Sequence, residues 1–378
     1  YYYKAYNLLK GKNTTEFQAC LDKAASLSPL NNYPFRIEEI VLFTTLLQER
    51  PNDALLHYHL GNLLYYLGQK ESGLEHWLHA TEADPAFAIA ARNVGFGYGC
   101  LNDLEKSMKY YDRAINANPN DPLLLTESDK IYEQANVPAT QRLKRLESHL
   151  KTVMKHDDAV MRLLTLYNAT AKYDKAIKIM DTRHFHLWEG GGQVHDIYVD
   201  SHMLKGMQLL KRKQYKEAIR EFDLANQYPA NLEVAPSPRG GYEAKVYYLS
   251  GIAYEAMKQA DKARECFEKS AETHFRDYLT DLNYYKIKSL RKLNKNEKAD
   301  AVLSNMQKTL ERMQQNLMDS YAKFGEANQN VQQSNISYYS GLIHLLLKNP
   351  SAAKNDFNQA IQLYPGNIWA KLMNEDVH

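Results

Sequence analysis

The residues best suited to chemistry lie in one short stretch, Arg183 to His195, which carries three histidines, a glutamate and a tryptophan. Imidazole and carboxylate groups can ligate zinc or iron. Here the His-x-His pair of His184 and His186 stands without a further acid or cysteine at ligand spacing. We therefore expect no metal ion between these two histidines, Glu189 and His195.

Trp188 and Glu189 allow two interpretations of this stretch. In one, Trp188 stacks on a sugar and Glu189 acts as an acid or base in the active site of a neighbouring domain. In the other, which we favour, the stretch is an ordered loop that Trp188 anchors on the helices, while Gly190, Gly191 and Gly192 allow a sharp turn.

The rest of the chain lacks the motifs of the common enzyme classes. There is no His-Glu-x-x-His, no nucleophile elbow and no dinucleotide fingerprint, and the glycine run is not followed by the Gly-Lys-Ser/Thr of a phosphate loop. The three cysteines are far apart, which fits neither a disulfide framework nor a zinc site. We expect no cofactor and no catalysis by these residues alone.

The elements that must position these residues follow a repeat of about 34 residues, the period of tetratricopeptide units. In each unit a small residue allows two helices to approach closely, and a large residue is predicted to fill the hole between neighbouring units. The small residues are Gly61, Gly95, Gly206, Gly251 and Gly341, and the large ones are Trp77, Tyr111, Phe222, Phe267 and Phe357. The pattern predicts an all-α solenoid, a right-handed superhelix of helix-turn-helix units.

Breaks in the period suggest four regions. Residues 1–53 are degenerate helical repeats, and residues 54–180 are a tetratricopeptide array with one degenerate unit. Residues 181–198 form the loop that contains Trp188, and residues 199–378 are a second array with long connections. Because the chain opens with three tyrosines and no initiator methionine, we expect it to be a piece of a longer protein.

The first helix of each tetratricopeptide unit lines a concave groove. Tyrosines at one groove-facing position of four units, with aromatic and polar neighbours, suggest a surface for a peptide or a sugar, although the rings could instead pack helix against helix. Asn62 and Asn93 match the asparagines of a carboxylate clamp, but its basic positions carry Tyr58, Leu123 and Glu127, so we reject a clamp. The candidate groove residues are Tyr58, Asn62, Tyr65, Arg92, Asn93, Phe96, Tyr248, Tyr284 and Tyr338.

Charge and hydropathy exclude two classes of partner. The net charge is +2 and there is no block of basic residues, so we expect no nucleic acid partner. No apolar run approaches the roughly 20 residues that span a bilayer, so we expect no membrane insertion.

Several stretches resemble one bacterial family, which joins an N-terminal domain similar to galactose-mutarotase-like β-sandwich proteins to a C-terminal tetratricopeptide array. The resemblance implies a bacterial protein of the cytoplasm or the periplasm, with a role in carbohydrate metabolism suggested by the sandwich half, which this chain lacks. The stretches are Pro34-Phe35-Arg36-Ile37-Glu38-Glu39-Ile40, Tyr58-His59-Leu60-Gly61-Asn62-Leu63-Leu64-Tyr65, Ala91-Arg92-Asn93-Val94 and Phe185-His186-Leu187-Trp188-Glu189-Gly190-Gly191.

Two hypotheses for function follow. The first is a protein-interaction scaffold, whose groove binds a protein or peptide partner or packs on the chain's own N-terminal domain. The second is the accessory half of a carbohydrate-active enzyme, in which the loop of His184, His186, Trp188 and Glu189 reaches a neighbouring active site and carbohydrate binds through the missing domain.

Overall fold

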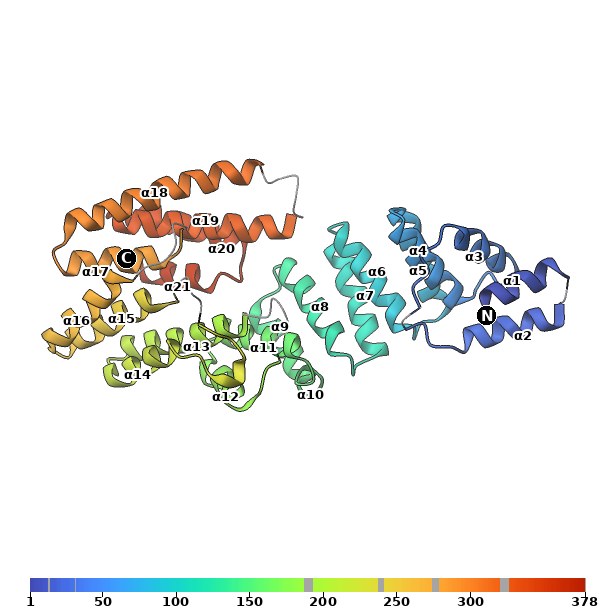
Figure 1. Ribbon diagram of the computed structural model, residues 1–378, viewed down its shortest axis with the longest axis horizontal. Helices are drawn as coiled ribbons and strands as arrows, with labels where there is room; N and C mark the ends of the chain where they lie inside the picture. The colour runs from blue at the N-terminus through green and yellow to red at the C-terminus, as the bar shows by residue number, and fades with distance from the viewer. Residues whose placement is uncertain are drawn as a thin grey trace. The chain divides into compact units, whose positions relative to one another are not determined.

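Helices are the only regular secondary structure in the part of the chain that is described (Figure 1). The computed structural model describes residues 1–12, 14–30, 32–186, 193–236, 241–273, 279–319 and 326–377. None of the helices described there is both long enough and apolar enough to cross a membrane. The prediction of an all-α helical repeat solenoid is confirmed.

The chain divides into two compact units. Unit 1 comprises Tyr1–Val137 and Ser148–Ala159, and unit 2 comprises Pro138–Glu147 and Val160–His378. The helices of unit 1 are α1 (Tyr2–Lys10), α2 (Thr14–Ala25), α3 (Glu38–Glu49), α4 (Ala54–Tyr66), α5 (Lys70–Ala83), α6 (Ala88–Cys100), α7 (Leu104–Ala117), α8 (Pro122–Gln134) and α10 (Leu150–Val153).

Unit 2 contains most of α9 and α11 and the helices that follow them. They are α9 (Ala139–Ser148), α11 (Asp157–Ala169), α12 (Tyr173–Thr182), α13 (Gln193–Lys211), α14 (Tyr215–Ala225), the 3-10 helix η1 (Ala230–Leu232), α15 (Glu243–Ala256), α16 (Ala260–Glu272), α17 (Leu282–Lys292), α18 (Asn296–Asp319), α19 (Glu326–Leu346), α20 (Pro350–Leu363) and α21 (Ile368–Asp376).

One tight turn recurs between paired helices along the chain. In this turn a backbone N–H just after the first helix donates to a carbonyl near the end of that helix. For example, the N–H of Gln69 donates to the carbonyl of Leu64, and the N–H of Asp103 donates to that of Tyr98. This closure requires one residue in the left-handed conformation, which glycine and asparagine adopt most readily. The residues that adopt it are Gly68, Asn102, Asn136, Ala171, Lys213, Lys258, Asn294 and Lys348.

In the five most regular pairs, an aromatic ring on the second helix lies over a glycine on the first. A Cβ atom built on Gly61 would lie 2.5 Å from Trp77 Cδ1, and one on Gly251 would lie 2.6 Å from Phe267 Cε1. The same arrangement joins Gly95 to Tyr111, Gly206 to Phe222 and Gly341 to Phe357. The sequence prediction of close helix approach is confirmed. It is corrected in one respect, because each ring covers the glycine of its own pair rather than only a hole between neighbouring units.

A methyl group has no room under these rings, so Gly61→Ala and Gly251→Ala should each destabilise the chain by about 1–3 kcal/mol through overpacking. Thermal unfolding measures the effect. The control is Gly11→Ala, because the added Cβ would lie 3.4 Å from its nearest neighbour, the carbonyl oxygen of Asn7, at ordinary contact distance. Variants at Gly61 and Gly251 that melt with the wild type would contradict the assigned helix pairing.

A buried histidine sits in the core of unit 1. His59 on α4 is only 1% exposed, and its ring stacks on that of Phe43 and meets that of Tyr2 edge-on. Its Nδ1 atom has no hydrogen-bond partner among the described residues. Because burial penalises the charged imidazolium, the pKa of His59 is lowered to about 4.

This burial makes unit 1 sensitive to acid. The unfolded chain takes up a proton at His59 near pH 6.5, whereas the folded chain resists protonation down to about pH 4, so stability should fall as the pH falls between these values. The loss reaches about 3 kcal/mol below pH 4.

Hydrogen exchange of the α4 amides would report this loss for unit 1. His59→Phe should remove the contribution of one titrating group, up to one proton, from the pH dependence of the free energy of unfolding. An equal pH dependence in His59→Phe and wild type would show that His59 is not the group responsible.

Candidate functional site

The first helices of unit 1 enclose an open groove of about 770 Å³. Its walls come from α4, α6 and α8, together with the segment between α2 and α3, so it lies on the face that the repeat pattern assigns to partner binding. We call it the unit 1 groove. Five of the predicted groove residues line it: Tyr58, Asn62, Tyr65, Arg92 and Asn93.

A chain of hydrogen bonds crosses the floor of this groove. Arg92 donates from Nε and Nη2 to the two carboxylate oxygens of Glu127, at 2.7 and 2.6 Å, and from Nη1 to Asn93 Oδ1 at 3.1 Å. Asn93 Nδ2 in turn donates to Asn62 Oδ1 at 2.9 Å, and Trp77 Nε1 donates to the same oxygen at 2.9 Å. The side chains of four helices, α4, α5, α6 and α8, are thus fixed to one another before any partner binds.

The ion pair at the end of this chain sets the charge of the groove. The hydrogen bonds that Arg92 donates to the Glu127 carboxylate hold the pKa of Arg92 above its usual value, so the guanidinium stays charged and paired. Arg92 is the one arginine or lysine among the described lining residues, which also include Asp121. Among these described residues no unpaired cation faces the groove, so the groove does not suit a ligand that binds through its carboxylate.

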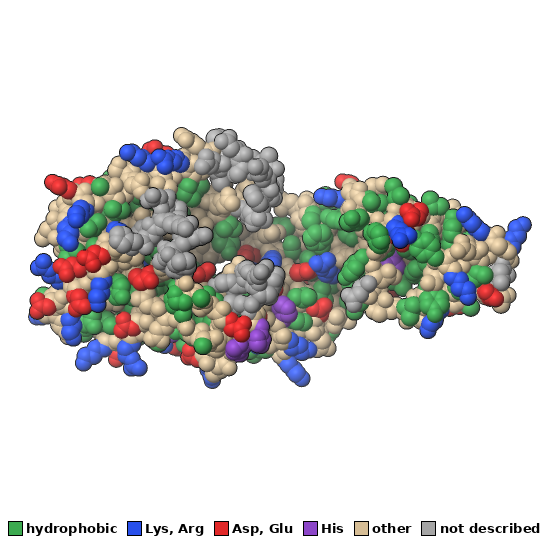
Figure 2. Space-filling model, in the orientation of Figure 1, with side chains coloured by type: hydrophobic (Ala, Val, Ile, Leu, Met, Phe, Trp, Pro, Cys, Tyr) green, Lys and Arg blue, Asp and Glu red, His purple; other side chains and the backbone are tan. Residues whose placement is uncertain are grey.

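The rim of the groove exposes large apolar side chains. Tyr66 is 72% exposed, Tyr33 68%, Leu30 62% and Leu123 47%, and all four line the groove. On the face drawn in Figure 2, hydrophobic side chains gather densely over unit 1. Concentrations of exposed apolar residues on a folded chain mark interaction sites more often than chance.

The aromatic candidates of unit 1 have different surroundings. The ring of Tyr58 is buried against Phe87, at 5.1 Å between centroids, and Tyr65 stacks on Trp77 at 4.7 Å. Phe96 is partly exposed beside the groove rather than among its lining residues, with the Arg92 guanidinium 5.5 Å from its ring centre. The six candidate groove residues of unit 1 therefore lie close together, five of them in the groove lining and Phe96 next to Arg92.

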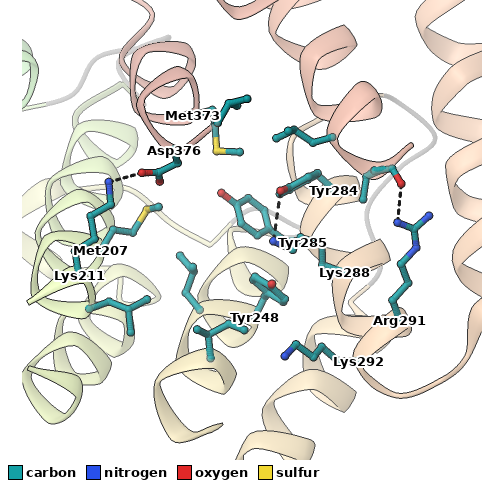
Figure 3. Close-up of a pocket in the computed structure, with 16 residues that line it drawn as sticks. Met207, Lys211, Tyr248, Tyr284, Tyr285, Lys288, Arg291, Lys292, Met373 and Asp376 are labelled. Carbon is teal, nitrogen blue, oxygen red and sulfur yellow. Dashed lines mark hydrogen bonds and ion pairs between the residues drawn. The ribbon is translucent and has the colours of Figure 1, made fainter. Parts of the chain in front are cut away.

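Unit 2 has a pocket of its own, of about 720 Å³, lined by α13, α15, α17, α19 and α21 (Figure 3). Tyr248 and Tyr284, both predicted from the sequence, line this unit 2 pocket. Tyr338 does not, because it is buried against Tyr339 and Phe357 in the core. The three tyrosines occupy the same position of their repeats, but those on α15 and α17 line the pocket, whereas the one on α19 lies in the core.

A partly buried lysine, Lys288, lies in the wall of the unit 2 pocket. The ammonium of Lys288 lies 5.0 Å from the ring centre of Tyr248 and 3.4 Å from the hydroxyl of Tyr284. Burial, and then the nearby charge of Lys292, lower the pKa of Lys288. Burial also raises the pKa of Tyr284 to about 12.

Helix α21 forms one wall of the unit 2 pocket and is held by a polar cluster that the sequence did not indicate. Trp369 on α21 donates from Nε1 to Asp200 on α13 at 2.9 Å, and the buried ammonium of Lys245 lies over its ring. Lys245 also bonds Asp281 at 2.9 Å. Burial raises the pKa of Asp200 to about 7, although the charge of Lys245 opposes that shift. Nothing in the repeat pattern indicates this cluster, since its members come from distant segments.

The histidine-rich stretch is described only in part, because Trp188 and Glu189 lie outside the described residues. His195 is separate from the other histidines, since it bonds the carbonyl of Gln227 and stacks on Tyr228 at 4.0 Å. His184 and His186 lie together beside Glu233, a residue that sequence reasoning did not single out.

The repeat pattern has a counterpart in a known family. The tetratricopeptide repeat model matches residues 98–121, 244–273 and 338–367. The second match corresponds to the pair α15–α16, and the third to the end of α19 and to α20. The chain contains tetratricopeptide repeats.

Three solved structures are similar to this chain in fold. YrrB, a TPR protein with an unusual peptide-binding site, is 16% identical over 61% of this chain and 91% of its own, with a TM-score of 0.28. A structure of Naa15/Naa10 bound to HypK-THB is 11% identical over 89% of this chain and 62% of its own, with a TM-score of 0.45. PilW, a type IV pilus biogenesis factor, is 12% identical over 57% of this chain and 90% of its own, with a TM-score of 0.30.

The lowered pKa of Lys288 means that a charged Lys288 destabilises the folded chain relative to the unfolded chain. Lys288→Met should therefore leave stability unchanged or raise it by about 1–2 kcal/mol at pH 7. The gain should fade as the pH rises toward 10.5, because the wild-type lysine then loses its proton in the unfolded state as well.

Chemical denaturation at several pH values measures this gain. Lys211→Met is the matched control, because Lys211 lines the same pocket but is half-exposed and pairs with Asp376. A loss of stability in Lys288→Met at pH 7, or a gain that grows with pH, would show that the ammonium stabilises the pocket instead.

Proposed function

We propose that this chain is a protein-interaction scaffold and that the unit 1 groove binds an extended, apolar and uncharged peptide segment of a partner protein. The observation that carries the proposal is the set of exposed apolar side chains around a groove whose polar floor is already hydrogen-bonded. Large exposed apolar side chains cost solubility and are retained where a partner covers them.

The polar floor supports recognition of a peptide backbone. An asparagine amide nitrogen carries two N–H groups, and Asn93 Nδ2 donates one of them to Asn62. The other can serve a backbone carbonyl of the ligand. Because Arg92 and Trp77 already fix the two asparagines, little side-chain entropy is lost on binding.

The charge of the groove supports an uncharged ligand segment. An acidic peptide would meet Glu127 and Asp121 with no unpaired cation among the described lining residues, and a basic peptide would have to compete with Arg92 for Glu127. Aromatic and aliphatic side chains instead match Tyr33, Tyr66 and Leu123 at the rim. The enzymatic hypothesis depends on Trp188 and Glu189, outside the described residues, and no described feature favours it.

Selection from a random peptide library on the full chain tests this proposal. We expect enrichment of peptides rich in aromatic and aliphatic residues and poor in charge. Tyr66→Ala and Leu123→Ala should each weaken the best peptide on the order of tenfold, equivalent to about 1.4 kcal/mol. Both side chains are largely exposed, so the fold should survive their loss.

The matched control is Leu101→Ala, an apolar residue of unit 1 that is 55% exposed but does not line the groove. It should bind the selected peptide like the wild type. No enrichment, or peptides that bind both groove variants with unchanged affinity, would contradict a peptide-binding groove. Enrichment of charged peptides would contradict the assigned chemistry.

A further inference from the structure

Two histidines and a glutamate from separate segments of unit 2 converge on one point of the surface. His184 Nε2 lies 2.7 Å from Glu233 Oε1, and His186 Nδ1 lies 3.7 Å from the same oxygen. One nitrogen of each imidazole and a carboxylate oxygen all fall within 4.8 Å of one another. Glu233 is 49 residues from His184 along the chain, so the spacing of the histidines could not reveal it.

The backbone around these side chains is fixed by contacts that do not involve them. Phe185 is fully buried, and its N–H donates to the carbonyl of Asn231 at 2.8 Å. In an extended segment alternate side chains point to opposite sides. The buried Phe185 therefore sends its two neighbours, His184 and His186, outward together.

The segment that carries Glu233 is tied to the same backbone. Asn231 Nδ2 donates to the carbonyls of Met180 and Arg183, at 2.6 and 2.8 Å. Glu233 follows η1 directly and holds a left-handed conformation, with φ 52°. The donor atoms are thus presented by two short segments that are hydrogen-bonded to each other.

We propose that His184, His186 and Glu233 form a binding site for a divalent transition-metal ion, with zinc the ion to test first. Two imidazoles and one carboxylate are a common ligand set for zinc. An ion bonded at 2.0–2.2 Å in tetrahedral geometry holds its ligand atoms about 3.3 Å apart, and the measured 2.7 and 3.7 Å lie on either side of that value.

Three protein ligands leave a coordination position for water or for a group of another molecule. All three side chains are exposed, so the ion can enter from solvent. The site is remote in sequence from the unit 1 groove and does not depend on the proposed peptide binding. Sequence reasoning predicted no metal among His184, His186, Glu189 and His195, and the proposal differs because Glu233 supplies the carboxylate.

The other histidine clusters of the described chain do not offer such a set. His57 Nδ1 bonds His76 Nδ1 at 2.8 Å, and His57 Nε2 bonds the carbonyl of Pro51, so the nitrogens face each other or the backbone. His202 shares Glu221 with Lys205, whose ammonium lies 2.8 Å from that carboxylate and would repel a cation.

Titration of the full chain with zinc chloride, in competition with a chromogenic chelator, tests the site. We expect one zinc ion per chain to bind in the wild type. His184→Ala, His186→Ala and Glu233→Gln should each weaken binding on the order of tenfold or more. His156→Ala is the matched control, because His156 is a half-exposed histidine near a single carboxylate, Asp158, and should bind zinc like the wild type.

A second measurement does not depend on the variants. Cobalt(II) added to the wild-type chain should give the visible absorption of a tetrahedral nitrogen and oxygen site, and zinc should displace it. Circular dichroism of the variants confirms their fold. Absence of zinc binding in the wild type, or zinc binding that survives in the His184→Ala/His186→Ala double variant, would overturn the proposal and leave a hydrogen-bonded His–Glu cluster.

Discussion

The fold depends on one repeated contact, an aromatic ring laid over a glycine of the facing helix. In the pair of α4 and α5 the indole of Trp77 occupies the space that a side chain on residue 61 would need, and Phe267 does the same above Gly251. The contact brings two helix backbones close together, so each helix pair packs as one unit, with an inner helix that faces the groove and an outer helix behind it. Neighbouring helix pairs then stack on their remaining apolar faces. The inner helices α4, α6 and α8 are thereby placed side by side, which creates the unit 1 groove.

The two units use the same scaffold for surfaces of different chemistry. In unit 1 the one arginine or lysine among the described groove-lining residues is paired with Glu127, and large apolar side chains remain exposed. In unit 2 helix α21 forms one wall of the pocket, Trp369 ties this helix to Asp200, and lysines stand among buried tyrosines. The two surfaces therefore differ in chemistry. Burial lowers the pKa of Lys288 in the unit 2 pocket, whereas the arginine that lines the unit 1 groove is paired with a carboxylate.

Much of the fold could be predicted from the sequence, because the glycine and aromatic positions recur at a fixed period and each pair is local in the chain. The groove candidates Asn62, Arg92 and Asn93 could also be predicted, since they occupy inner helices of adjacent regular units. The sequence could not place Tyr338, because burial at that position depends on how α19 packs on its neighbours. Nor could it pair Glu233 with His184, or Trp369 with Asp200, because these contacts join segments far apart that no repeat relates.

We propose that the inner helices of unit 1 are the surface that a partner covers. Hydrogen–deuterium exchange of the full chain, with and without a saturating selected peptide, is the most direct test, because it maps the covered surface without any mutation. We expect slower exchange in α4, α6 and α8 and in the segment between α2 and α3, with α5 and α7 unchanged. Protection confined to the outer helices α5 and α7, or to unit 2, would contradict it.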